Sequence, residues 1–382
     1  MPHPPQRRYL DNAATTWPKP EAVWTAWNDA ARRLGATAGR AVYREAVEAG
    51  SVREAARRAF ARLLGGVDPA RVALPAGCTL ALNQAIHGLV RPGDHVIATA
   101  ADHNATLRPL HTLSRAGVID LTIVPCDGVG RVDPAAIELA WLPATRLVAI
   151  SHASNVTGCL QDLPAVVGIA HARGGLVLLD AAQSLGQVAC ATPGFGADVV
   201  AAPAHKWILG TAGAAVLWCR AGVDPVPLVQ GGTGSASDSL EMPEAFTERH
   251  EAGTPDVPAL ASAAAAIGWL EDRGMAAGGE GCRRLAAACA RRLRDVRGLR
   301  VIADPSGAPI VSFTVEDYAP ADVAAILEEA AGVQVRSGHH CAAAVHEYLG
   351  THDGGTVRAS FGPFSTAGDV DALVDTLTAI VG

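Results

Sequence analysis

Seven short apolar runs recur between residues 71 and 219, and a segment of helical or loop character follows each of them. The runs span residues 71–74, 95–98, 121–124, 147–150, 176–179, 199–201 and 215–218. Continuous apolar strands that alternate with helices are typical of a mostly parallel sheet with helices on both faces. The sequence therefore predicts an α/β fold whose large domain is built on such a sheet.

The rest of the chain predicts a second, smaller α/β domain. Residues 228–258 form an irregular stretch rich in glycine, serine and proline. Beyond it we expect alanine-rich helices at about 256–273 and 279–297, a helix near 320–331, and strands at 299–302, 310–315, 333–336 and 356–360. We therefore expect a large domain at 17–258 and a small domain made of 1–16 and 259–382.

Charge and cysteine patterns argue against several classes of function. The net charge is −7, and the arginines are interleaved with acidic residues, so we expect no nucleic-acid partner. We find no signal-peptide core, and the longest apolar runs are too short to span a bilayer, so we expect a cytoplasmic protein without a membrane partner. The eight cysteines form no CxxC pairs, which favours reduced core thiols over a disulfide framework or a metal site.

Polar residues follow four of the apolar runs in the predicted large domain. They are Asp102-His103-Asn104, the segment 151–155, the segment 180–183, and His205-Lys206. Ligands of parallel sheets bind beyond the carboxyl ends of the strands. We therefore expect these side chains to meet in one crevice.

Lys206 carries the strongest functional signal in that crevice. The chain has 31 lysine and arginine residues, and the other lysine, Lys19, lies between prolines in a predicted solvated turn. Unlike arginine, a desolvated lysine can lose its proton and form a Schiff base. Asp180 follows four apolar residues and needs a cationic partner. Together they predict pyridoxal 5′-phosphate, with its aldehyde held by Lys206 and its ring nitrogen kept protonated by Asp180.

Three residues are candidates for binding the cofactor phosphate. Cys78 and Thr79 lie between a predicted strand and a predicted helix, where backbone amides and the Thr79 hydroxyl can bind an anion. His205, next to the lysine, can contact the same phosphate. Each feature alone is equally consistent with an ordinary helix cap or a structural histidine.

Three further residues are candidates for contacts with the cofactor ring. His103 can stack on the pyridine ring, and Gln183 can hydrogen-bond the phenolate oxygen, which Asn155 can approach from the neighbouring strand end. The structural alternatives are a core histidine and ordinary loop amides. The Asp180 carboxylate likewise has the alternative of a helix N-cap.

The predicted small domain carries a second group of reactive residues. Arg336 and Cys341 lie in a loop with His339 and His340, where the positive surroundings can favour a thiolate. Arginine binds carboxylates through a bidentate fork. Arg358 interrupts an otherwise apolar strand and therefore requires an anion, for which a substrate α-carboxylate would serve.

Taken together, these residues resemble the class V aminotransferase group of pyridoxal-phosphate enzymes. Within it the chain is similar to the group II (Suf-type) cysteine desulfurases and the selenocysteine lyase-like proteins. The resemblance runs from the motif at 9–16 through 180–183, 205–206 and 251–255 to Arg358, and the Arg-x-Gly-x-His-Cys loop at 336–341 is its most specific part. It implies a fold-type I homodimer in which Thr254 reaches the phosphate site of the partner.

The resemblance also implies a reaction. L-Cysteine would be bound through its carboxylate by Arg358, with Arg336 and Asn155 as further substrate contacts, and Lys206 would move the Cα proton. Cys341 would take the substrate sulfur as a persulfide, alanine would leave, and an acceptor protein or a reductant would receive the sulfur.

One departure from the family pattern and two alternatives accompany this interpretation. Pro203 replaces the serine or threonine that usually lies two residues before His205, which removes a hydroxyl and an N–H from the phosphate site. The alternatives are a selenocysteine lyase or another class V Cβ–S lyase, and a cofactor-retaining sulfur-transfer partner with little turnover alone. Cys341 favours sulfur transfer over transamination, because transamination has no use for a thiol.

Overall fold

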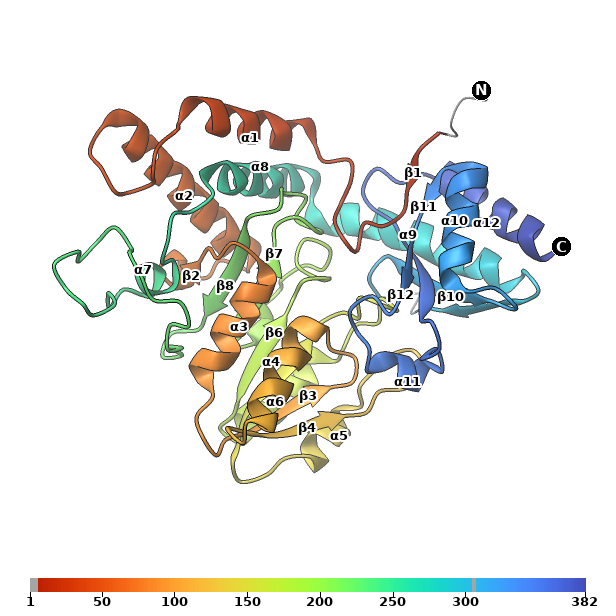
Figure 1. Cartoon of the computed structure of the whole chain (residues 1–382), viewed down its shortest axis with the longest axis horizontal. Coiled ribbons are helices and arrows are strands. Elements are labelled where there is room, and N and C mark those ends of the chain that lie inside the picture. The colour runs from red at the N-terminus through yellow and green to blue at the C-terminus, as the bar shows by residue number, and fades with distance from the viewer. Residues whose placement is uncertain (1–5, 304–306) are drawn as a thin grey trace.

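The computed structural model describes residues 6–303 and 307–382 (Figure 1). In this part of the chain the seven apolar runs form one sheet in the order β2–β8–β7–β6–β5–β3–β4. The strands are β2 (Val72–Ala73), β3 (His95–Thr99), β4 (Asp120–Val124), β5 (Thr145–Ser151), β6 (Leu176–Asp180), β7 (Val199–Pro203) and β8 (Ala215–Cys219). All pairings are parallel except those of β8 with β2 and β7, so the predicted mostly parallel sheet is confirmed.

Helices cover both faces of this sheet because successive side chains of each strand point to opposite sides. In β5, Val148 and Ile150 join a core with α2 (Arg44–Leu63), α6 (Leu163–Ala172) and α8 (Val257–Arg273). Leu147 and Ala149 join the opposite core with α3 (Cys78–Leu89), α4 (Asn104–Arg115) and α7 (Phe246–His250). The remaining helices of this region are α1 (Glu21–Arg33) and α5 (Pro134–Leu139). With both faces apolar, the polar residues gather at the strand ends.

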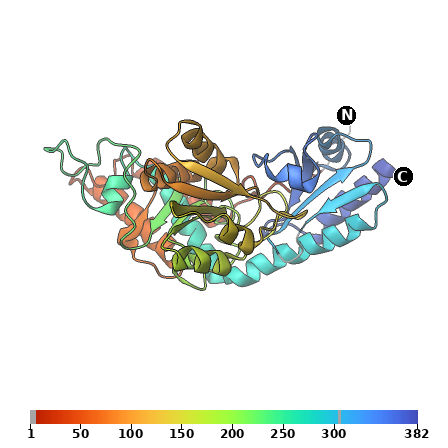
Figure 2. The ribbon, with the colours of Figure 1, turned by 90° about the horizontal axis from the view of Figure 1, so that it is seen from below.

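A smaller antiparallel sheet lies to the side of the first, at the right of Figure 1. Its order is β12 (Arg336–Gly338), β13 (Thr356–Ser360), β10 (Ile310–Val315) and β9 (Leu299–Ile302). It shares an apolar core with α9 (Met275–Arg294), α10 (Pro320–Ala331) and α12 (Ala367–Val381). Figure 2 shows α9 running along this domain, and the short helix α11 (Val345–Leu349) completes it.

The prediction of one continuous strand at 333–336 is wrong, because the chain forms two separate strands there. The first, β11 (Val333–Gln334), pairs in parallel with β1 (Arg8–Tyr9) near the start of the chain. The second, β12, pairs with β13 instead. The break redirects the chain toward the loop that carries Cys341.

The packing of α8 bears on where the boundary between the two proposed domains lies. We expected the small domain to resume at residue 259, near the beginning of α8. However, α8 packs against α1 and α2, and Leu260 and Ile267 belong to a core of the large sheet. We therefore propose that the boundary lies at Gly274, where α8 ends.

Candidate active site

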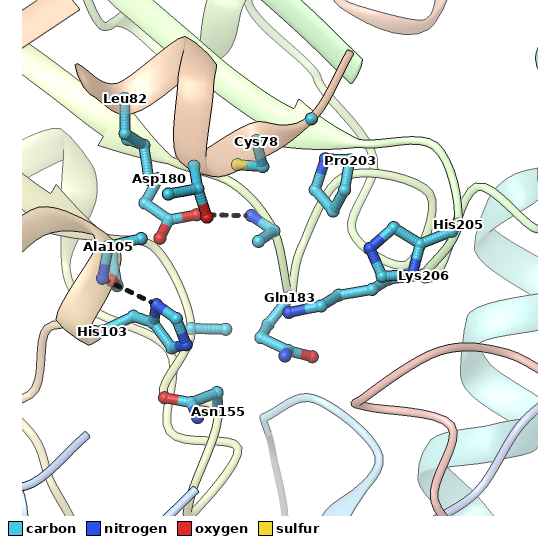
Figure 3. A pocket seen from close by; sticks show the side chains of 15 residues that line it. Cys78, Leu82, His103, Ala105, Asn155, Asp180, Gln183, Pro203, His205 and Lys206 are labelled. Carbon is cyan, nitrogen blue, oxygen red and sulfur yellow. Dashed lines mark hydrogen bonds between the residues drawn. The ribbon is translucent and has the colours of Figure 1, made fainter. Parts of the chain in front are cut away.

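A cavity of about 280 Å³ lies where β5, β6 and β7 end (Figure 3). Eight of the residues predicted to bind a cofactor line it, and they come from helix N-termini, a strand end and loops that are distant in sequence. They are Cys78, Thr79, His103, Asn155, Asp180, Gln183, His205 and Lys206. The expected meeting of these strand ends in one crevice is therefore observed.

Lys206 projects into the cavity from the turn that follows β7. Burial lowers the pKa of its amine, with the nearby Asp180 carboxylate acting in the opposite direction. Within the described part of the chain, no hydrogen bond or ion pair engages the Lys206 Nζ. A buried amine that is easily deprotonated and has no protein partner is suited to act as a nucleophile or a base.

Lys19 differs from its prediction, because it is half-buried and not a solvated turn residue. Its Nζ donates to Thr16 Oγ1 and to the carbonyl of His205, both at 3.3 Å. Burial lowers the pKa of Lys19 to about 8. This lysine therefore supports the backbone beside Lys206 from outside the cavity.

Asp180 ends β6 with its side chain in the cavity, and only 5% of the residue is exposed. Burial raises the pKa of its carboxyl, while the amide of Ala182, which donates to Oδ1 at 2.9 Å, and the charge of Lys206 oppose the rise. The Ala182 contact is the turn-type hydrogen bond that we considered as the structural alternative. One such bond leaves the second carboxylate oxygen available for a cationic ligand.

Two histidines in the cavity are neutral near pH 7. Burial is the main cause that lowers the pKa of His103 and that of His205, each to about 4. His103 is the N-cap of α4, and its Nδ1 accepts a hydrogen bond from the amide of Ala105, so Nε2 carries the ring hydrogen. This bond orients the imidazole toward the cavity (Figure 3).

The N-terminus of α3 forms the anion-binding end of the cavity. Gly77 is the N-cap and supplies no side-chain hydrogen bond, while Gly77, Cys78 and Thr79 all line the cavity. Uncapped backbone amides of a helix N-terminus bind phosphate well. Pro203, at the end of β7, lies in the lining without an N–H, as the sequence indicated.

Gln183 and Asn155 use their amides to contact other parts of the protein. Gln183 Nε2 donates to the Ala13 carbonyl at 2.9 Å, and its Oε1 accepts from Trp207 Nε1 at 2.6 Å. Asn155 Nδ2 donates to the carbonyl of His340 at 2.6 Å, in the loop that carries Cys341. Their predicted contacts with a cofactor stay predictions, and each amide nitrogen retains one further hydrogen to donate.

Ser151 is a cavity residue that the sequence placed in the crevice, within the segment 151–155, but to which we assigned no role. It is the last residue of β5, and its buried Oγ has no hydrogen-bond partner among the described residues. Its amide donates to Asp102 Oδ1 at 2.6 Å, and burial raises the pKa of Asp102 to about 7. The available signal was a hydroxyl residue ending an apolar run at the predicted crevice.

Arg358 and Arg336 lie directly opposite each other on β13 and β12. Arg358 is 1% exposed, and it donates from Nη2 to Asp11 at 2.7 Å and from Nη1 to the Asn155 carbonyl at 2.8 Å. Its buried Nε has no partner in the described residues. Two facing cations destabilise a sheet unless an anion lies nearby. Asp11, which the sequence motif contained but we did not single out, supplies part of that charge.

Cys341 is the exposed cysteine among eight that all carry free thiols. Arg336 Nη2 donates to its Sγ at 3.4 Å. His340 and Cys341 have φ angles of 50° and 59°, a left-handed conformation that costs on the order of 1–3 kcal/mol for each residue without other support. That support includes Asn155, which bonds the His340 carbonyl, and the amide of Asn104, which donates to the Cys341 carbonyl at 2.8 Å.

Thr254 lies outside the cofactor cavity of its own chain. It is exposed and lines a different cavity, together with Leu74, Gln84 and His250. Its predicted contact with a partner subunit therefore stays a prediction.

The described residues contain no cluster of three or more histidine, cysteine or acidic side chains arranged to hold a metal. Among the helices of this same part of the chain, none has the length and apolar character required to cross a membrane.

The donors and acceptors of the cavity fit pyridoxal phosphate. The uncapped amides of α3, the buried carboxylate of Asp180 and the half-buried amine of Lys206, which has no protein partner, all line this one cavity. These groups match, in turn, a phosphate, a protonated ring nitrogen and an aldehyde. The orphaned Ser151 hydroxyl adds a polar atom that a ligand can satisfy.

Comparisons with known proteins agree with this chemistry. The family model described as aminotransferase class V matches residues 8–373. A probable cysteine desulfurase of Methanothermobacter thermautotrophicus is 34% identical, covering 98% of this chain and 94% of that protein. A probable cysteine desulfurase of Pseudomonas aeruginosa is 33% identical, covering 95% and 91%. The apo structure of a cysteine desulfurase from Thermococcus onnurineus superposes with a TM-score of 0.91 at 28% identity, covering 98% of this chain and 95% of that one.

Proposed function

The chain belongs to the aminotransferase class V family, and from this membership we propose that it is a pyridoxal-phosphate-dependent cysteine desulfurase. It would convert L-cysteine to L-alanine and receive the sulfur on an enzyme cysteine. When bound, the cofactor would supply an electron sink for bond cleavage at the substrate amino acid.

Different residues of the cavity would bind the phosphate, the ring nitrogen and the ring face of the cofactor. The α3 amides with Cys78, Thr79 and His205 would bind the phosphate. Asp180 would accept a hydrogen bond from the protonated ring nitrogen, a role supported by its burial and its single backbone hydrogen bond. His103 would lie against the ring as a neutral imidazole, since burial keeps its pKa far below 7.

Lys206 would hold the cofactor and then move the substrate Cα proton. The lowered pKa of its amine supports this role, because it makes the neutral form, which acts as a general base, easier to reach. Arg358 would bind the substrate carboxylate through its unpartnered Nε and its remaining N–H groups. Asp11 and the Asn155 carbonyl keep the guanidinium in place for this contact.

The exposed thiol of Cys341 is the observation that carries the proposal of sulfur transfer. Arg336 donates to its Sγ, a hydrogen bond that becomes stronger when the sulfur is a thiolate. The loop backbone is attached to the large domain through Asn155 and Asn104, which holds the sulfur near the cavity. Cys341 would attack the sulfur of cysteine and keep it as a persulfide.

The test is alanine formation from L-cysteine in the presence of a reductant by three proteins. They are the wild type, Cys341→Ala, and Cys190→Ala as a matched control at a half-buried cysteine outside the site. We expect alanine from the wild type and the control, and a Cys341 persulfide detectable by mass spectrometry in both. Cys341→Ala should retain the cofactor and form little alanine.

Other outcomes would redirect the assignment. Equal alanine formation by Cys341→Ala would remove the cysteine from the mechanism. If none of the three proteins forms alanine although cofactor is bound, selenocysteine and other Cβ–S substrates become the next candidates. Bound cofactor without turnover on any of them, alone or with acceptors, would favour the sulfur-transfer partner role.

We also propose that the enzyme is a homodimer that works in the cytoplasm. Thr254 is exposed outside its own cofactor cavity, which supports a role at the phosphate site of the partner subunit. A reducing compartment would keep the Cys341 thiol free. Light scattering together with a Thr254→Ala variant tests the dimer, since cofactor affinity should fall in that variant although the residue does not line the cavity of its own chain.

A further inference from the structure

A groove of about 430 Å³ adjoins the cofactor cavity and reaches Cys341. It shares Thr79, His103 and Ala105 with the cavity, so His103 belongs to the lining of both spaces. Cys341 lines the groove, whereas the residues that line the cofactor cavity do not include it. The sulfur-carrying residue therefore faces a second space that the proposed desulfuration does not explain.

The packed pair α3 and α4 forms the walls of this groove, called here the α3–α4 groove. Thr79, Asn83 and His87 recur every four residues and present one face of α3. Asn104, Arg108 and Thr112 have the same spacing on α4. Polar side chains thus line both walls along two turns of each helix.

The α3–α4 groove is positively charged. Arg108 is exposed and has neither a hydrogen bond nor an ion pair within the described part of the chain. Arg336 contacts Cys341 at the end of the groove. Among the described residues that line it, none carries a carboxylate. An unpaired guanidinium that lines the same groove as a sulfur nucleophile favours a ligand that carries its own negative charge.

The size and polarity of the groove favour a small molecule over a protein partner. Small-molecule sites commonly have volumes of roughly 300–1,000 Å³. The centre of a protein interface is rich in aromatic and apolar side chains. Here the apolar contributions come from Ala105 and Pro109, between polar neighbours.

We propose that the α3–α4 groove binds the sulfur acceptor, a low-molecular-mass thiol that carries a carboxylate recognised by Arg108. The proposal rests on the proposed function, because that function supplies the Cys341 persulfide. Free cysteine and thiol-containing peptides share this chemistry.

The transfer step needs no external oxidant or reductant. The acceptor thiolate attacks the outer sulfur of the persulfide and forms a new S–S bond with it. The bond between that sulfur and Cys341 Sγ breaks, and its electron pair stays on Cys341, which leaves as a thiolate beside Arg336. The persulfide proton remains on the transferred sulfur, so one thiolate and one persulfide enter and one of each leaves.

The first experiment probes the groove without turnover. Cys341 in the cofactor-loaded protein is alkylated with anionic iodoacetate or neutral iodoacetamide, and mass spectrometry measures the rate at this residue. We expect Arg108→Gln to lower the ratio of iodoacetate rate to iodoacetamide rate about threefold to tenfold. Arg115→Gln, an exposed arginine on the same helix outside the groove lining, should leave the ratio unchanged. An unchanged ratio in Arg108→Gln would overturn the groove as an anion site.

The second experiment follows sulfur release in a single turnover. The enzyme is loaded with L-cysteine and desalted, its persulfide is quantified, and mercaptopropionate or mercaptoethanol is added at equal thiolate concentration. The wild type and Arg115→Gln should release sulfur to mercaptopropionate about threefold to tenfold faster, and Arg108→Gln should lose this preference. Added salt should reduce the preference as well.

The outcomes separate this proposal from the proposed function. A persulfide that forms normally but shows equal release to both thiols, or release to a protein acceptor alone, overturns the groove proposal and leaves desulfuration standing. If no persulfide and no alanine form, desulfuration fails and the transfer step falls with it. The alkylation ratio still reports whether the groove prefers anions.

Discussion

The cofactor cavity and the Cys341 loop differ in their exposure to solvent and in what holds them in place. In the cavity, Asp180 is buried and Lys206 is half-buried, and burial shifts the pKa of each in the direction that favours its neutral form. In the loop, Cys341 is exposed and its backbone adopts a left-handed conformation. The cavity is built on strand ends of a sheet buried on both faces, whereas the loop depends on a few hydrogen bonds from the large domain.

The difference shows how one chain separates two kinds of chemistry. Proton movement at a substrate carbon benefits from a dry site, where a lysine is easily deprotonated and charges interact strongly. Sulfur delivery requires a nucleophile that an acceptor can reach. Asn155 joins the two regions, because its side chain donates to the loop at the His340 carbonyl and its own carbonyl accepts a hydrogen bond from Arg358.

The largest expected effect is the loss of Lys206. In Lys206→Ala, the cofactor should no longer become covalently attached after borohydride treatment, and desulfuration should fall by at least about 10³-fold, since a base and an attachment point are lost together. Intact mass measures the attachment. Lys19→Ala is the matched control, because it removes the only other lysine and should retain attachment. Attachment that persists in Lys206→Ala would contradict the assignment.

Asp180→Asn tests whether the burial of the carboxylate serves the cofactor. The variant keeps the shape and the turn hydrogen bond but loses the charge, so kcat/KM should fall about 10²- to 10³-fold. The absorbance spectrum of the bound cofactor should shift with it. Asp162→Asn, at the exposed N-cap of α6, should change neither quantity, because asparagine caps as well as aspartate. A normal spectrum in Asp180→Asn would restrict this residue to its turn-forming role.

Arg358 lies where the two regions meet, and its effect should fall on substrate binding. Arg358→Ala should raise the KM for cysteine about tenfold to hundredfold with cofactor content unchanged, because charged hydrogen bonds to the carboxylate are lost. Since this buried residue also supports folding, Asp11→Asn provides a milder test. It should raise KM about threefold by loosening the guanidinium. An unchanged KM in both variants would shift carboxylate binding to Arg336.

Acid should destabilise both regions. Burial lowers the pKa of seven histidines. The pKa falls to about 4 for His103, His152, His205, His250 and His346 and to about 2 for His340, and it is lowered for His95 as well. Their stabilisation is complete above pH ~6.5 and is lost as pH falls toward 4, because the unfolded chain binds protons first. At pH ~5 each of these histidines should lower the free energy of unfolding by up to about 2 kcal/mol.

Asp102 acts in the opposite direction, because its raised pKa, about 7, means that its stabilisation is lost as pH rises from about 4 through 7. Burial also raises the pKa of Asp180, which acts in the same direction as Asp102. Two carboxyls do not offset seven histidines, so the midpoint of urea unfolding should decrease as the pH is lowered from ~7 to ~5. Fluorescence of the tryptophans measures it. A midpoint that does not change over this range would mean that these histidines can be protonated without unfolding.

The fold was largely predictable because apolar runs are a local signal. Each predicted run became a strand within one or two residues of its expected bounds, and the helices expected at 256–273 and 320–331 form α8 (Val257–Arg273) and α10 (Pro320–Ala331). The pairing of β1 with β11 was not predictable, because it joins segments more than 320 residues apart through two-residue strands. Strands this short have no measurable periodicity.

The membership of the cofactor cavity was also predictable, but the partners of its side chains were not. Residues that follow parallel strands must meet at one sheet edge, so eight candidates converged there. The sequence did not indicate that Gln183 bonds Ala13 and Trp207, or that Asn155 bonds the loop at His340. Amide side chains have several donors and acceptors, and the choice among them depends on what packs nearby.

Chain order and residue chemistry were enough to indicate a mostly parallel sheet, a buried lysine and aspartate at its edge, and a reactive cysteine in a later loop. Apolar periodicity and the cost of burying charge act over a few residues, so they can be read from the sequence. The Asp11–Arg358 pair, the contact of Arg336 with Cys341, and the α3–α4 groove beside that cysteine required the folded molecule. Each depends on how segments remote in sequence pack together, and that packing is a property of the whole core.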